Sequence, residues 1–250
     1  MKRFIGILLL LTACARTTTV PPDNFVHHDI QTPTFTLFSF QKITDMTVVK
    51  IYIEGDGNSF DGRGMPTTNP TPRDDFMRNL AFNDPSPNVV YLARPCQYVD
   101  DEMCQESDWT VARFSANTID ATASAIKKIA GNRPVILIGF SGGAQIAGLV
   151  AAKHPEIDIK KIITVAGNLD HPAWTSAYSL MPLSGSLDLN NYRHEFDKIP
   201  QLHFIGDKDT VIPHTITINF VGDVERVQVV PGAEHSTGFD SIYFDIWKAQ

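Results

Sequence analysis

The chain has 250 residues, of which 43% are apolar and 20% are charged, and its formal net charge is −7. This length and composition suit one globular domain with a sizeable core, so a second domain is not required. The negative charge argues against nucleic acid as a main partner, because phosphate binding needs a basic surface.

The first residues have the pattern of an export signal. Lys2 and Arg3 precede an apolar run over residues 4–13, and Cys14 follows the run. A helix needs about 20 apolar residues to cross a bilayer, so this shorter run suits the apolar region of a signal peptide. Its end, Leu-Thr-Ala-Cys at residues 11–14, resembles the lipobox of bacterial lipoproteins.

The lipobox resemblance implies that a signal peptide, residues 1–13, is removed and that Cys14 then carries acyl chains such as palmitate. More than one acyl chain is needed for stable anchoring. Residues 14–32 are polar and rich in Thr and Pro, which predicts a tether. Ala15 is not the Asp that retains many lipoproteins at the inner membrane, so we expect an outer-membrane anchor facing the periplasm. The alternative is a plain secretory signal with an incidental cysteine.

Short β-rich runs alternate with helical patterns along the rest of the chain. The run at 135–138 is wholly apolar, which is typical of a parallel strand covered on both faces. The alternation itself indicates βαβ units and a mostly parallel sheet. The predicted strands are 35–43, 47–53, 88–92, 135–138, 162–165, 202–205 and 227–230, and the predicted helices are 73–82, 115–130, 142–154 and 239–248.

Residues 167–200 interrupt this rhythm. The segment is long, rich in Pro, Asn, Ser and aromatic residues, and has no clear period. Long irregular segments in compact domains are often lids or binding loops, so we expect a short irregular lid here.

The strongest chemical signal is Gly-Phe-Ser-Gly-Gly at residues 139–143, after an apolar strand and at the start of a small-residue helix. A nucleophile elbow requires this order of strand, sharp turn and helix, with a strained backbone at the serine. Glycines are needed there because larger side chains would collide with the neighbouring strand and helix. The placement predicts Ser141 as a nucleophile; the alternative is a structural turn.

A serine hydroxyl needs a base, and a further group that orients the base, to act as a nucleophile near neutral pH. Of the eight histidines, His235 lies in a loop after the last predicted strand, where the base of such an enzyme arrives in chain order. The other histidines lie in the tether, at helix ends, in the irregular segment or in a strand. The sequence therefore predicts His235 as the general base.

The acid is expected after the strand that ends at residue 205. Residues 206–213, Gly-Asp-Lys-Asp-Thr-Val-Ile-Pro, resemble a segment common in the α/β-hydrolase superfamily, in which the second acid belongs to the triad. That resemblance implies Asp209 as the orienting acid and Asp207 as a turn residue. Asp170 is the alternative, because some members take the acid from the position after an earlier strand.

The resemblance implies an α/β-hydrolase fold for residues 33–250, with a mostly parallel central sheet flanked by helices. The segments 92–98 and 166–170, Leu-Ala-Arg-Pro-Cys-Gln-Tyr and Ala-Gly-Asn-Leu-Asp, also resemble a group of uncharacterised bacterial hydrolase lipoproteins.

The same resemblance implies an oxyanion hole made by two backbone N–H groups. One belongs to Gly142. The other is expected in residues 54–57, Glu-Gly-Asp-Gly, which are similar to a His-Gly-x-Gly segment with Glu54 in place of the histidine. Matching by position gives the N–H of Asp56. A carboxylate there would disfavour an oxyanion unless it points away.

Cys96 and Cys104 are the two cysteines that remain after Cys14. An exported protein meets an oxidising compartment, so the prediction is a disulfide between them. Metal binding is the weaker alternative, because no histidine or further cysteine lies nearby in the sequence.

These residues predict a serine hydrolase that cleaves carboxylic esters or thioesters through an acyl-enzyme, without metal or organic cofactor. The expected partners are a small-molecule or lipid-like ester and, through the anchor, a membrane. A peptidase with the same triad and a non-catalytic, envelope-anchored binding module are the alternatives.

Overall fold

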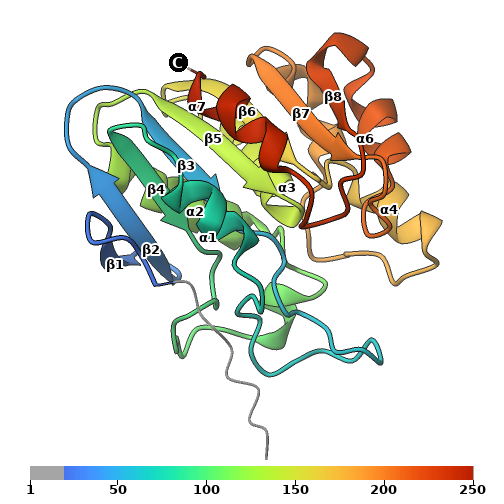
Figure 1. Ribbon diagram of the computed structural model, residues 1–250. Helices are drawn as coiled ribbons and strands as arrows, with labels where there is room; N and C mark the ends of the chain where they lie inside the picture. Colours follow the sequence, from blue (N-terminus) through green and yellow to red (C-terminus); the bar gives the residue numbers. More distant parts are fainter. Residues whose placement is uncertain (1–19, 250) are drawn as a thin grey trace, which may run out of the picture.

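A computed structural model describes residues 20–249, which form an eight-stranded sheet with helices on both faces (Figure 1). Strands β4 and β3 and β5 to β8 run parallel, whereas β1 and β2 form an antiparallel edge. In sheet order the strands are β1 (Val26–Gln31), β2 (Thr36–Ile43), β4 (Asn88–Leu92), β3 (Val49–Ile53), β5 (Val135–Phe140), β6 (Ile159–Val165), β7 (Gln201–Gly206) and β8 (Val227–Val230).

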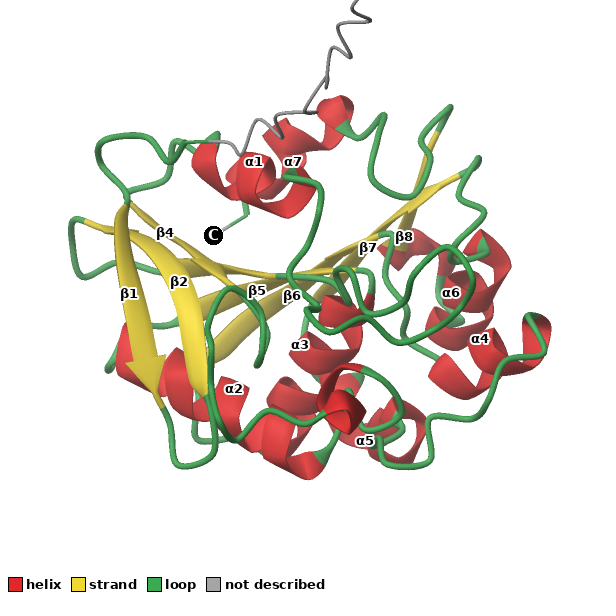
Figure 2. Ribbon diagram, turned by 90° about the horizontal axis from the view of Figure 1, so that it is seen from below, coloured by secondary structure: helices red, strands yellow, loops and turns green. Residues whose placement is uncertain are grey.

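The helices divide between the two faces of the sheet, as Figure 2 shows for α1 and α7 on one side and α2, α3 and α5 on the other. The α-helices are α1 (Phe76–Phe82), α2 (Ala116–Ala130), α3 (Gly142–Lys153), α4 (His171–Ala177), α5 (Arg193–Phe196), α6 (His214–Val221) and α7 (Tyr243–Trp247). Short 3₁₀ turns are η1 (Glu106–Trp109), η2 (Leu189–Tyr192), η3 (Val224–Arg226) and η4 (Asp240–Ile242).

Two apolar cores follow from the alternation of side chains along the central strands. In β5, Ile136 and Ile138 pack in the core that contains residues of α1 and α7. Val135 and Leu137 of the same strand pack in the core that contains residues of α2 and α3. Burial of every residue of β5 confirms the predicted parallel strand covered on both faces and, with the sheet, the expected fold class.

The register brings the ends of neighbouring strands together. Gly139 of β5 lies opposite Ile53 of β3 and Thr164 of β6. The loops after these parallel strands therefore leave the sheet at one edge, where open α/β sheets place their ligand sites.

The predicted tether is wrong in its last residues. Val26–Gln31, inside the range 14–32, form β1 and pair with β2, so the ordered domain begins before residue 33. The strand was missed because only Ile30 of β1 is buried, which leaves an edge strand with a mostly polar sequence. The signal peptide at 1–13 and the acylation site at Cys14 lie outside the described residues.

Residues 167–200 are less irregular than expected, because they include α4, η2 and α5. Leu189 and Phe196 are fully buried and lie against α3, where they pack around Gly148. These are isolated apolar residues that pack across a long separation in sequence, so no local period revealed them. None of the helices within residues 20–249 has the length and apolar character needed to cross a membrane.

Candidate active site

Ser141 lies in a sharp turn between β5 and α3, with a positive φ of 50°. Its N–H donates to the carbonyl of Val165 at 3.1 Å, which ties the turn to the neighbouring strand. A Cβ atom on Gly139 would lie 2.5 Å from the carbonyl oxygen of Gly143, and one on Gly143 would overlap the carbonyl oxygen of Ile53. The turn therefore has the strained, glycine-dependent geometry of a nucleophile elbow, with Ser141 just before the start of a helix.

His235 links Ser141 to Asp209. Its Nε2 atom lies 3.1 Å from the Ser141 Oγ atom, and its Nδ1 atom lies 2.9 Å from Asp209 Oδ2. The other carboxylate oxygen of Asp209 accepts from the N–H groups of Val211 at 2.8 Å and Ile212 at 2.9 Å. With Asp209 ionised, Nδ1 donates to the carboxylate, and Nε2 is left to accept the proton of the serine hydroxyl.

The structure also places the other candidate acids. Asp170 is the N-cap of α4, where its side chain accepts from the N–H of Ala173 at 2.9 Å. Asp207 accepts from the N–H of Gly232 at 2.6 Å, as expected of a turn residue. Asp209, and not Asp170, is therefore the carboxylate that the fold brings to His235.

The side chain of Asp56 points toward the elbow. An unpaired carboxylate in this position would disfavour an oxyanion. Its carboxylate occupies the space that a Cβ atom on Gly142 would take. Arg113 pairs with it at 2.6 Å, Arg94 forms a second ion pair, and both guanidinium groups are buried. Burial alone would raise the pKa of Asp56, but the two guanidinium groups lower it to about 2. The carboxylate is thus ionised and compensated by two positive charges.

Glu54, two residues earlier, has a different environment. Its carboxyl group accepts from the N–H of Gly55 and from the Tyr91 hydroxyl, each at 2.8 Å. Burial raises the pKa of Glu54 to about 7, although these hydrogen bonds act in the opposite direction. This residue, which replaces the histidine of the expected segment, therefore changes its charge near neutral pH.

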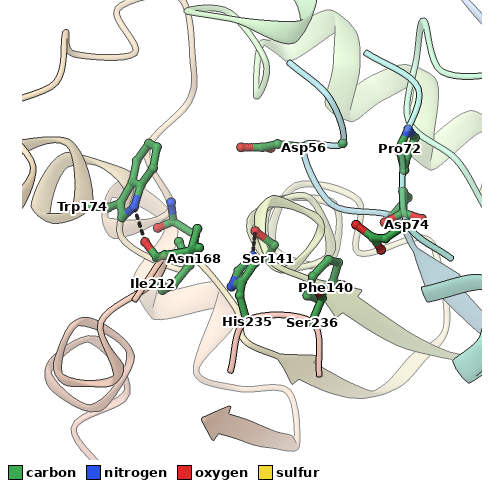
Figure 3. A pocket seen from close by; sticks show the side chains of 13 residues that line it. Asp56, Pro72, Asp74, Phe140, Ser141, Asn168, Trp174, Ile212, His235 and Ser236 are labelled. Atoms are coloured by element: carbon green, nitrogen blue, oxygen red, sulfur yellow. Dashed lines mark hydrogen bonds between the residues drawn. The ribbon is translucent and has the colours of Figure 1, made fainter. Parts of the chain in front are cut away.

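A pocket of about 180 Å³ opens over the elbow (Figure 3). It is smaller than the pockets of about 300–1,000 Å³ that hold drug-sized molecules. One wall is made by Asn168, Trp174 and Ile212, and the indole N–H of Trp174 donates to the carbonyl of Val211 at 2.8 Å. The rest of its lining includes Glu54, Asp56, Pro72, Asp74, Phe140 and Ser236.

The predicted disulfide between Cys96 and Cys104 is present. Within residues 20–249, no group of three or more His, Cys, Asp or Glu side chains could hold a metal ion. Arg94, Arg113 and Asn168 were not predicted as site residues. Arg94 and Arg113 are 38 and 57 residues from Asp56, so no local pattern pairs them with it.

Comparison with known proteins gives a family match. Residues 96–236 match the family described as Serine hydrolase (FSH1). Among curated proteins, no sequence matches this chain significantly.

Several solved structures have a similar fold. XC6422 from Xanthomonas campestris, described as an α/β serine hydrolase without lid, is 14% identical over 92% of this chain and 93% of its own, with a TM-score of 0.53. An α/β serine hydrolase homologue from Coxiella burnetii is 17% identical over 92% and 97%, with a TM-score of 0.54. TT1662 from Thermus thermophilus is 12% identical over 90% and 99%, with a TM-score of 0.57.

These identities establish a shared fold only. The family match, in contrast, spans more than half of the chain and includes Ser141, Asp209 and His235. The protein therefore belongs to the FSH1 serine hydrolase family, within the α/β-hydrolase superfamily.

Proposed function

We propose that this protein hydrolyses carboxylic esters or thioesters with Ser141 as nucleophile, His235 as general base and acid, and Asp209 as the group that orients His235. The observation that carries the proposal is the continuous hydrogen-bonded series from Ser141 Oγ through His235 to Asp209, at 3.1 Å and 2.9 Å. Its members meet in a pocket at the carboxyl edge of the parallel sheet.

In the proposed reaction, Ser141 Oγ attacks the carbonyl carbon of the ester while its proton passes to Nε2 of His235. The negative charge of Asp209 stabilises the imidazolium that forms. His235 then gives the proton to the leaving alcohol or thiol as the acyl-enzyme forms. Water, deprotonated by His235, attacks the acyl-enzyme and releases the acid.

We assign the oxyanion hole to the backbone N–H groups of Gly142 and Asp56. The start of α3 favours negative charge at Gly142. The Asp56 carboxylate would repel an oxyanion if its charge were unbalanced, but Arg94 and Arg113 supply two positive charges to its one. The balance of charge beside the elbow is therefore compatible with an oxyanion.

We also propose that the mature protein is lipid-anchored at Cys14 in the bacterial envelope, at the outer membrane. The support is the Leu-Thr-Ala-Cys segment at residues 11–14 and the Ala that follows it. Incorporation of labelled palmitate into the wild type but not into Cys14→Ser would test the anchor. Equal labelling of the two proteins would rule it out.

The function is tested with wild type beside Ser141→Ala. Both proteins are treated with a fluorophosphonate probe and with nitrophenyl esters of increasing chain length. We expect labelling to disappear and turnover to fall on the order of 10⁴-fold or more in Ser141→Ala, because the nucleophile is lost. The small pocket leads us to expect the fastest turnover for short acyl chains.

Two results would favour the other functions. A wild type that is folded but neither labels nor hydrolyses any ester would favour a binding module. Faster cleavage of peptide amides than of matched esters would favour a peptidase. The circular dichroism of both proteins controls for folding.

A further inference from the structure

Asn168 is a pocket residue to which the proposed reaction gives no role. It follows β6 and lies close to the nucleophile, because its backbone N–H donates to the carbonyl oxygen of Ser141 at 3.0 Å. Only 3% of the residue is exposed, and it lines the pocket beside Trp174 and Ile212 (Figure 3). Its position is therefore fixed by the backbone of the elbow itself.

The side chain of Asn168 is unusual for a buried polar group. Its Oδ1 atom is buried and has no hydrogen-bond partner within the described part of the chain, residues 20–249. Nearly all buried amide oxygens in folded proteins have a partner, because an unpaired acceptor that has lost water is destabilising. An exception beside a nucleophile points to a ligand that supplies the missing donor.

The neighbours of Asn168 do not donate a hydrogen bond to its Oδ1 atom. The indole N–H of Trp174 is already bound to the carbonyl of Val211, and the N–H of Ile212 is bound to Asp209. In this wall, Trp174 and Ile212 present apolar side-chain surface to a substrate. Asn168 is therefore the polar feature of a wall that is otherwise apolar, in a pocket of only about 180 Å³.

We propose that Asn168 determines substrate specificity: its carboxamide turns about the Cβ–Cγ bond and brings the buried Oδ1 atom to the pocket, where it accepts a hydrogen bond from a hydroxyl or amide N–H group of a small ester. The substrate class is thus short esters with a hydrogen-bond donor near the scissile bond, rather than esters of plain alkyl chains. An apolar ester of the same shape leaves the amide oxygen unpaired, and this is the basis of selection. The inference rests on the proposed ester hydrolysis at Ser141.

Two pairs of shape-matched esters test the inference, one for each side of the ester. On the acyl side, the 4-nitrophenyl ester of N-acetylglycine is compared with that of 4-methylpentanoic acid. On the alcohol side, 2-hydroxyethyl acetate is compared with propyl acetate. The ratio of kcat/KM within a pair is measured for wild type, Asn168→Leu and Ile212→Val. Comparing this ratio between proteins removes differences in intrinsic ester reactivity and in the fraction of active enzyme.

We expect Asn168→Leu to lower the polar-to-apolar ratio about tenfold in at least one pair, which corresponds to the loss of one hydrogen bond. Ile212→Val changes the same wall without removing a polar group, so it should alter both members of a pair equally. A purely structural role of Asn168 would also alter both members equally.

An unchanged ratio in both pairs, in an Asn168→Leu protein that folds and hydrolyses the apolar esters, would overturn the inference and leave the proposed function intact. A folded wild type that hydrolyses none of the four esters would instead remove the proposed function, and this inference with it.

Discussion

The part of the chain that matches the serine hydrolase family, residues 96–236, supplies Ser141, Asp209 and His235, whereas the preceding residues supply Glu54 and Asp56. The first group forms one hydrogen-bonded series, as expected from the chain order. The two carboxyl groups are close in sequence but differ in pKa, because two guanidinium groups lower the pKa of Asp56 to about 2 whereas burial raises the pKa of Glu54 to about 7. Chain order thus predicts the members of the hydrogen-bonded series, whereas partners far away in the chain set the charges beside it.

The largest effect is expected in the hydrogen-bonded series of Ser141, His235 and Asp209. Asp209→Asn should lower kcat for ester hydrolysis on the order of 10³- to 10⁴-fold, because His235 loses the carboxylate that holds its tautomer and stabilises its positive charge. Asp170→Asn is the matched control, since asparagine can still cap α4, and we expect a change of less than about threefold. The kcat of both variants is measured with nitrophenyl esters. A larger loss of kcat in Asp170→Asn than in Asp209→Asn would assign the orienting acid to Asp170.

The next effect tests the ion pairs of Asp56. Asp56→Asn should lower the free energy of unfolding by about 3–5 kcal/mol, because two buried guanidinium groups lose their compensating charge. Asp158→Asn breaks the exposed pair with Lys160 and should cost less than about 1 kcal/mol. Urea unfolding near neutral pH measures both. Equal stability of the two variants would show that the buried cluster contributes no more than a surface pair.

Glu54 predicts a dependence of stability on pH. Its pKa is raised from 4.5 to about 7 in the folded protein, so the folded state holds the proton more tightly than the unfolded chain. The free energy of unfolding should therefore fall by roughly 3 kcal/mol as pH rises from about 4.5 to about 7, and this contribution is level above pH 7.

Glu54→Gln has no carboxyl group to titrate, so the difference in stability between wild type and variant should change over that pH range. Urea unfolding at several pH values measures the difference. A constant difference from pH 4 to pH 8 would contradict the raised pKa. For Asp56, whose pKa is lowered from 3.8 to about 2, the sign is opposite, and its contribution should be lost as pH falls through that range.

The smallest effect is expected for the disulfide that links Cys96 to Cys104. Replacing both cysteines by alanine should lower the free energy of unfolding by about 2–3 kcal/mol, because the unfolded chain regains the freedom of a short closed loop. Thermal unfolding of the wild type with and without a reductant gives an independent measure. A variant as stable as the wild type would mean that the bond adds no net stability.

Much of the fold could be predicted from local sequence. The wholly apolar run at β5 and the glycines around Ser141 are short-range patterns with few structural solutions, a covered parallel strand and a sharp strand-to-helix turn. His235 was predicted from chain order, by its place after the last strand, and the structure brings its Nε2 atom to 3.1 Å from Ser141 Oγ. For the acid, the sequence left two candidates, and the fold brings Asp209 to His235 while Asp170 caps a helix.

The remaining features depend on contacts between residues far apart in the chain. Strand β1 is defined by pairing with β2, because its own sequence buries little apolar surface. The charge of Asp56 depends on Arg94 and Arg113, and that of Glu54 depends on its burial. By itself, the sequence determined the order of the elements and the sharp glycine-rich turn at Ser141, since these follow from local hydrophobic period and backbone sterics. Only the tertiary structure decided which charges are paired and which polar groups are left without a partner, because burial and long-range proximity are properties of the packed chain.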